Sequence, residues 1–194
     1  MYIAGIKDET REALVGNRLM LILVFIVYAA INTVLGRFYI GFIFLPVFMA
    51  GFYLLHKVFL QEKSINIENL FHFFKDLNHA LKLLGVYLLV TLFVAIGLAL
   101  LIVPGIILGL QYSQALYIMA DNKEMTVWEA LERSKELMHG HKGEFFKVIL
   151  TIFGHLLLGI ITLGIYLVYI IPYINCLLVN YYLHLSYQDK YVIS

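Results

Sequence analysis

The chain has 194 residues, of which 62% are hydrophobic and only 14% are charged, and its mean hydropathy is +0.86. A soluble domain carries about 25% charged residues, so this composition excludes an ordinary water-soluble domain and indicates an integral membrane protein. The net charge of +1 argues against nucleic-acid binding. The single cysteine, Cys176, excludes an internal disulfide and any multi-cysteine metal site.

Runs without charged residues predict an all-α polytopic membrane protein with six transmembrane helices in three hairpins. The runs Leu19–Gly36 and Phe38–His56 are each about one crossing long. The runs Leu83–Ala120 and Val148–Gln188 are about twice as long. As a single helix the last would extend about 60 Å, whereas a hydrocarbon core is about 30 Å thick. Each long run must therefore cross twice and turn within itself.

The positive charges predict the orientation of these helices. All fourteen Lys and Arg residues except Arg37 fall in the N-terminal segment, the segments 57–82 and 121–147, or the C-terminal segment. Lys and Arg concentrate in cytoplasmic loops. We therefore expect both termini to be cytoplasmic, with Arg37 alone on the other side.

Two of the charged segments, 66–81 and 126–140, have the pattern of amphipathic helices. Thr126 and Glu129 form a capping-box sequence, and Gly140 is well placed to end the helix. The expected apolar faces are Ile67, Leu70, Phe71, Phe74, Leu77 and Leu81 in the first and Val127, Ala130, Leu131, Leu137 and Met138 in the second. Both segments are predicted to lie in the cytoplasmic headgroup layer; the alternative is packing on cytoplasmic loops. Residues 10–16 suggest a shorter third example.

The order of these pieces predicts three internal repeats within a single membrane domain, 10–61, 66–121 and 126–188. Each repeat consists of an amphipathic helix, a span, a glycine turn and a second span with an early proline. The prolines concerned are Pro46, Pro104 and Pro172.

The sixth predicted span carries a polar and aromatic stripe. Its members are Tyr166, Tyr169, Tyr173, Cys176, Asn180, His184 and Tyr187. At helical spacing they fall within an arc of about 80°, and such a stripe is expected to face the interior of the bundle. The candidate interior residues are Gln111, Gln114, His155, Tyr169, Tyr173, Asn180 and His184. They either line a polar binding site or pathway, or form hydrogen bonds that hold the helices together. His155 could likewise relay protons or be a neutral histidine bonded between helices.

No sequence motif for catalysis or for a cofactor occurs in the chain. Glu136, His139 and His141 have a spacing that resembles metal ligands, but solvated loop histidines are the favoured interpretation. No acidic residue lies deep in a predicted span, which argues against a carboxylate-coupled pump. We therefore expect neither an enzyme, nor a metal, nor a cofactor.

Several motifs resemble one bacterial family of predicted integral membrane proteins, domain-of-unknown-function family nine hundred and seventy-five. The motifs are Arg11…Leu14…Gly16-Asn17, Ile102-Val103-Pro104-Gly105, Ala130-Leu131…Ser134…Met138…Gly140…Lys142…Phe146, Thr162-Leu163-Gly164-Ile165 and Pro172-Tyr173. Arg18 and His155 stand where this family often has tryptophan. The resemblance implies a bacterial plasma-membrane protein without implying an activity. A more distant likeness to the membrane domain fused to some glycerophosphodiester phosphodiesterases hints at a connection with lipid.

The function expected from these features is binding. The protein would act in the bacterial plasma membrane on a lipid or protein partner, without catalysis, and its contacts would be the bilayer, a partner protein or further copies of the chain. The alternative is a small channel or transporter with a polar path along the sixth helix.

Overall fold

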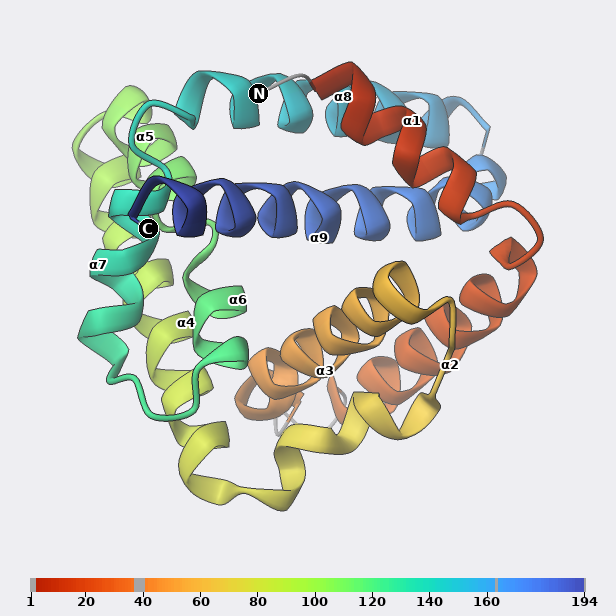
Figure 1. Cartoon of the computed structure of the whole chain (residues 1–194), viewed down its shortest axis with the longest axis horizontal. Coiled ribbons are helices and arrows are strands. Elements are labelled where there is room, and N and C mark those ends of the chain that lie inside the picture. Colours follow the sequence, from red (N-terminus) through yellow and green to blue (C-terminus); the bar gives the residue numbers. More distant parts are fainter. Residues whose placement is uncertain (1–2, 37–40, 163, 194) are drawn as a thin grey trace.

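A computed structural model describes residues 3–36, 41–162 and 164–193, and this part of the chain is helical throughout (Figure 1). Its elements are α1 (Ile3–Ala13), α2 (Arg18–Gly36), α3 (Gly41–Glu62), the 3-10 helix η1 (Ile67–Lys75), α4 (Leu77–Leu100), α5 (Ile102–Tyr112), α6 (Ala115–Asp121), α7 (Val127–Leu137), α8 (Lys142–Ile161) and α9 (Ile165–Ile193). The shorter elements α1, η1 and α7 each precede longer apolar helices, and the three repeats stay a prediction.

Five stretches of the described chain are long and apolar enough to cross a membrane. They are Ile43–Glu62, Leu77–Leu100, Ile102–Asp121, Lys142–Ile161 and Ile165–Asp189. A sixth arises if α1 and the part of α2 up to Ile31 form one broken span, although these two helices meet at 92°. The chain is thus compatible with a multi-pass membrane protein, whereas the count of six and the three hairpins stay predictions. Arg37 lies outside the described residues.

Helix α9 is the centre of the molecule. In Figure 1 it crosses the middle, with α8 above it and α3 below it, and it contacts α1, α2, α3, α7 and α8. Half of its apolar window is buried, and α3 is buried to a similar extent. By contrast, α4 and α8 expose most of their apolar side chains. An exposed apolar surface of this size is expected where lipid replaces water.

Helix α7 confirms the predicted capping box. The Thr126 hydroxyl oxygen accepts from the Glu129 N–H (3.3 Å), and a Glu129 carboxylate oxygen accepts from the Thr126 N–H (2.6 Å). Gly140 adopts a φ of +79° just after the helix, a conformation that favours glycine. The predicted apolar face is present, but Ala130, Leu131, Leu137 and Met138 are buried against neighbouring helices. Because α4, α5, α6 and α9 cover this face, the burial favours the alternative of packing on protein, and a position in the headgroup layer stays a prediction.

The segment 66–81 is not the single helix that its pattern predicts. It divides at Asp76, whose carboxylate accepts hydrogen bonds from the N–H groups of Asn78 and His79 and so caps the start of α4. In η1, Leu70 and Phe73 point inward and are buried. The other members of the predicted face remain exposed: Ile67, Phe71, Phe74, Leu77 and Leu81. This exposed row, unlike the face of α7, keeps the surface that an interfacial segment needs.

At the turn of the second predicted hairpin, two glycines are in close contact. A Cβ at Gly97 would lie 2.9 Å from the Cα of Gly105, so α4 and α5 approach closely where they meet. Further along, the predicted fourth span breaks between α5 and α6 at Ser113 and Gln114. The Ser113 hydroxyl donates to the Leu110 carbonyl (2.8 Å), and such a bond back to the preceding turn favours bending of a helix.

The segments that the charge pattern assigns to one side of the membrane contact one another. Their ion pairs are Lys57–Asp121 (2.6 Å), Lys123–Asp76 (2.6 Å) and Arg133–Asp189, and His184 Nε2 is hydrogen-bonded to Glu9 (2.8 Å). These contacts join the N-terminal segment, the segments 57–82 and 121–147 and the C-terminal part of α9, whereas Arg18 of the N-terminal segment meets Tyr169 near the other end of α9. Placement of all these segments on one side stays a prediction.

Labelling of introduced cysteines tests which side this is. With Cys176 replaced by alanine, we expect Arg37→Cys to react with an impermeant thiol reagent from outside, and Lys135→Cys only after the membrane is opened. Lys135 is exposed on α7, in the segment with the positive charges. Labelling of both positions from the same side would refute the predicted topology.

Asp76 gives the fold a dependence on pH. The ammonium of Lys123 and the N–H groups that Asp76 caps hold the pKa of this carboxyl below its ordinary value of 3.8. A carboxyl whose pKa is lowered by folding stabilises the fold above its ordinary pKa, and this contribution is lost as the pH falls through the lowered value. We expect Asp76→Ala to lower the melting temperature at pH 7, and the gap to wild type to narrow towards pH 3. An equal gap at both pH values would contradict this; Glu12→Gln on α1, exposed in the structure, is the control.

Candidate functional site

The polar stripe on α9 is covered mainly by α1. Tyr173, Cys176 and Asn180 are buried, whereas Tyr169 and Tyr187 remain half exposed. The two helices are distant in sequence but in contact, and α1 lies beside the right-hand part of α9 in Figure 1. The stripe therefore faces protein in its central part, as its spacing predicts.

Glu9 is the main partner of the stripe. One of its carboxylate oxygens, Oε2, accepts from Asn180 Nδ2 (3.3 Å) and from His184 Nε2 (2.8 Å). Asn180 Nδ2 also donates to the hydroxyl of Thr10 (3.2 Å), which itself donates to the Ile6 carbonyl (2.7 Å). The polar groups in the middle of α9 are thus bonded to side chains of α1.

His155 joins the other end of the same stripe. Its Nδ1 lies 2.8 Å from the Tyr166 hydroxyl, and its ring packs edge-on against Tyr173 with centroids 6.1 Å apart. The guanidinium of Arg18 lies 4.1 Å from the centre of the Tyr169 ring, a cation–π contact. Here too the predicted residues are bonded to one another.

Gln111 and Gln114 are not brought to the stripe, which corrects the expectation that they are its partners. Gln111 accepts from the Lys142 ammonium (2.8 Å) through Oε1 and from the Ser134 hydroxyl (2.9 Å) through its backbone carbonyl. Gln114 is buried and donates to the Ser113 hydroxyl (2.9 Å). For Gln111 the reason is that α5 packs on α4, α7 and α8, so this side chain meets Lys142 at the start of α8, whereas Gln114 lies at the start of α6.

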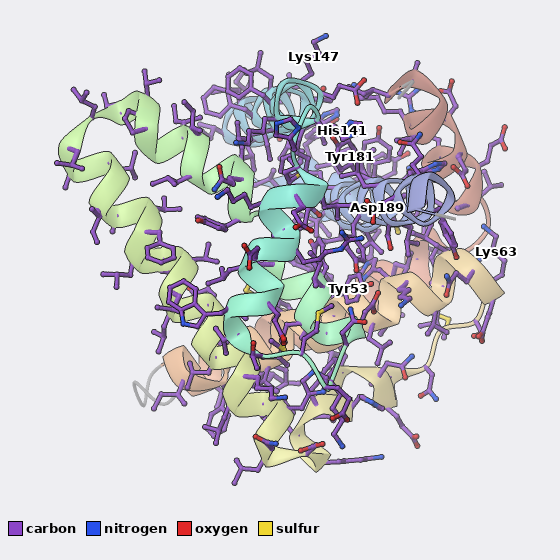
Figure 2. All side chains as sticks on the ribbon, turned by 60° about the vertical axis from the view of Figure 1, so that its left-hand side comes forward. Tyr53, Lys63, His141, Lys147, Tyr181 and Asp189 are labelled. Atoms are coloured by element: carbon purple, nitrogen blue, oxygen red, sulfur yellow. The ribbon has the colours of Figure 1, made fainter. Side chains whose placement is uncertain are left out.

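A groove of about 240 Å³ opens beside Glu9, between α1, the end of α3 and α9. Its lining residues are Glu9, Ala13, Leu60, Gln61, Lys63, Asn180, Leu183, His184 and Tyr187. Gln61 Nε2 donates to the Tyr187 hydroxyl (3.1 Å) across the groove. Lys63, at the outer end of α3 (Figure 2), brings a positive charge to the same groove as the Glu9 carboxylate.

On the other side of α9 lies a cluster that the sequence analysis missed. The carboxylate of Asp121, at the end of α6, accepts from the hydroxyls of Tyr53 (2.9 Å) and Tyr182 (3.2 Å) and pairs with the Lys57 ammonium (2.6 Å). The available signal was that Asp121 and Lys57 are the first charged residues after two apolar runs. An assignment by hydropathy alone places such charged residues in the loops between spans.

The loop histidines form no metal centre in the part of the chain that the structure describes, where no three His, Cys, Asp or Glu side chains converge. The backbone carbonyl of His141 instead accepts from the Tyr181 hydroxyl (3.3 Å), which fixes the start of α8 on α9; both residues are labelled in Figure 2. Glu136 pairs with Arg133 (3.1 Å) on the surface of α7.

Comparison with known proteins gives one match. Residues 90–189 match the family model described as protein of unknown function (DUF975). This stretch includes the motifs from Ile102 to Tyr173 that carry the resemblance in sequence. No curated protein and no solved structure matches the chain.

Proposed function

The chain belongs to the DUF975 family of proteins of unknown function, and we propose that it is a non-enzymatic membrane protein that binds a lipid headgroup in the groove beside Glu9. Its proposed place is the bacterial plasma membrane, with both termini cytoplasmic. The observation that carries the proposal is the lining of this groove. A carboxylate and an ammonium, from Glu9 and Lys63, face the same space of about 240 Å³.

The charges of the groove favour a zwitterionic headgroup. The ammonium of such a headgroup complements Glu9, and its phosphate complements Lys63 and the N–H groups of Gln61. Leu60, Ala13 and Leu183 also line the groove and provide apolar surface beside the charges. A lipid presents charged groups and apolar chains together, whereas a soluble ion presents charge only.

The contacts of α1 favour binding over transport. A pathway along α9 needs polar groups that are free to face a passing ion or solute. Asn180 and His184 are instead bonded to Glu9, and His155 is bonded to Tyr166. The one feature in favour of a channel is the groove itself, which lies at the end of the stripe.

Stabilisation by lipid tests the proposal. We expect short-chain phosphatidylethanolamine to raise the melting temperature of the detergent-purified protein more than phosphatidylglycerol does. Lys63→Gln should weaken this effect at least several-fold, because the phosphate loses its cationic partner. Asp8→Asn, an exposed change on the same turn of α1 as Glu9, is the matched control and should leave it unchanged. Equal stabilisation by both lipids, unaffected by Lys63→Gln, would refute the groove as a headgroup site.

Reconstitution into liposomes tests the alternative. We expect wild type to pass neither ions nor small solutes, and Asn180→Leu to alter stability alone. Reproducible flux through wild type that is lost in correctly folded Asn180→Leu protein would contradict the binding proposal and favour transport.

A further inference from the structure

A second cavity lies away from the groove and is lined by other residues. It has a volume of about 130 Å³ and lies between α2, α3, α6 and α9. Its lining residues are Phe25, Tyr28, Met49, Phe52, Tyr53, His56, Tyr117, Asn175 and Val179. Five of these nine side chains are aromatic rings other than histidine, and none carries a permanent charge.

His56 supplies the cavity with a hydrogen-bond acceptor. The side chain is only 1% exposed, and its Nδ1 lies 2.8 Å from the Phe52 carbonyl oxygen. A carbonyl oxygen only accepts, so Nδ1 carries the hydrogen. In the neutral ring, Nε2 then carries a lone pair and can accept a hydrogen bond. This buried Nε2 has no hydrogen-bond partner among the described residues. A buried acceptor without a partner is costly, and an occupant of the cavity with a donor removes that cost.

The rings around His56 favour a positive charge. Tyr28 stacks on Phe52 with centroids 4.5 Å apart, and Tyr53 stacks on Tyr117 at 4.6 Å. The faces of aromatic rings attract cations. Tyr53 also donates its hydroxyl to the Asp121 carboxylate, which increases the electron density of its ring. Lys57 Nζ already lies 5.8 Å from the centre of the Tyr53 ring, and its charge is balanced by the Asp121 carboxylate.

We propose that this cavity binds a small primary ammonium group, which donates a hydrogen bond to His56 Nε2 and places its charge against the aromatic rings. An engineered cavity of about 150 Å³ accommodates benzene, so this one admits an amine of a few carbons such as ethanolamine. The amine is either a free solute or the headgroup of an amino lipid. A quaternary ammonium satisfies the rings but has no hydrogen to donate to His56.

Binding of three probes to the detergent-purified full chain tests the site. We expect ethanolamine to bind at least tenfold more tightly than ethylene glycol, its uncharged counterpart, and more tightly than tetramethylammonium. Equal affinities of ethanolamine and ethylene glycol would refute the proposal, and this comparison needs no variant. Isothermal titration in an amine-free buffer provides the measurement.

Variants of His56 test whether the amine binds at this residue. His56→Phe keeps a ring and removes the acceptor, so ethanolamine should bind about tenfold or more weakly, while His56→Gln restores an acceptor and part of the affinity. His72→Phe, an exposed histidine of η1, is the matched control. Glu9→Gln removes the carboxylate with which ethanolamine could bind in the groove, so an ethanolamine affinity that persists in this variant separates the cavity from the groove. Unchanged affinity in folded His56→Phe protein would overturn the assignment.

Nanodiscs distinguish the two sources of the amine. If the natural ligand is a lipid headgroup, phosphatidylethanolamine in the disc should compete with ethanolamine, and phosphatidylcholine should not. If it is a free amine, the two discs should give the same ethanolamine affinity. Either result supports the ammonium site and identifies its source, whereas absence of ethanolamine binding in both discs would refute the site.

Discussion

Replacing Asp121 by alanine is expected to lower the free energy of unfolding by about 3 kcal/mol. Hydrogen bonds to a charged group contribute about 1.5–3 kcal/mol each, and this carboxylate serves Tyr53, Tyr182 and Lys57 together. Its loss leaves two largely buried hydroxyls without an acceptor and an ammonium that is only 23% exposed without a counter-charge. Breaking such a pair from one side is costly because the remaining charge stays in place. Denaturation in detergent, by heat and by added SDS, measures the change.

Two further variants separate the parts of this effect. Asp121→Asn keeps an oxygen for the tyrosines and loses only the charge, so we expect an intermediate loss. Lys57→Met added to Asp121→Ala should recover part of the stability, because it removes the unpaired ammonium. Glu132→Gln, an exposed acid on α7, provides the control. A loss for Asp121→Ala no larger than that of the control would show that the cluster contributes nothing.

Local signals in the sequence were sufficient for several elements. The capping residues Thr126 and Glu129 predicted the start of α7 because an N-cap depends on residues adjacent in the chain. The spacing of Tyr173 and Asn180 predicted that their face of α9 is buried, because helix periodicity relates sequence to direction, although Tyr181 and Tyr182 on other faces are buried too. The breaks at Asp76 and Ser113 were missed although they are also local. In both, a side chain bonds to nearby backbone, and hydropathy does not register this.

Local signals in the sequence could not predict which residues come together in the candidate sites. Periodicity gives the face of a helix but not its partner, and Glu9 meets Asn180 from the far end of the chain. The same holds for Asp121, whose partners come from α3 and α9. His56 is the last residue of an apolar run, and nothing in the sequence singles it out. Only packing of four helices around it shows that it is buried beside a cavity.

Gly51→Ala is expected to be the most disruptive change of a single methyl group, with a loss of about 2–3 kcal/mol. A Cβ at this position would lie 2.3 Å from the carbonyl oxygen of Leu70 and 2.9 Å from its Cα. These are backbone atoms, and the Leu70 side chain is fully buried, so η1 cannot yield by a rotamer change. The alanine must therefore push η1 away from α3.

The matched control for this change is Gly154→Ala on α8. A Cβ there meets nothing within 4 Å, and alanine favours helix over glycine by up to about 1 kcal/mol, so this variant should melt at or above the wild-type temperature. In Gly51→Ala we expect a lower melting temperature and faster amide exchange in residues 67–75, where displaced η1 loses its contacts with α3. Exchange that is unchanged there, in a protein as stable as the Gly154→Ala variant, would show that η1 and α3 do not touch at this glycine.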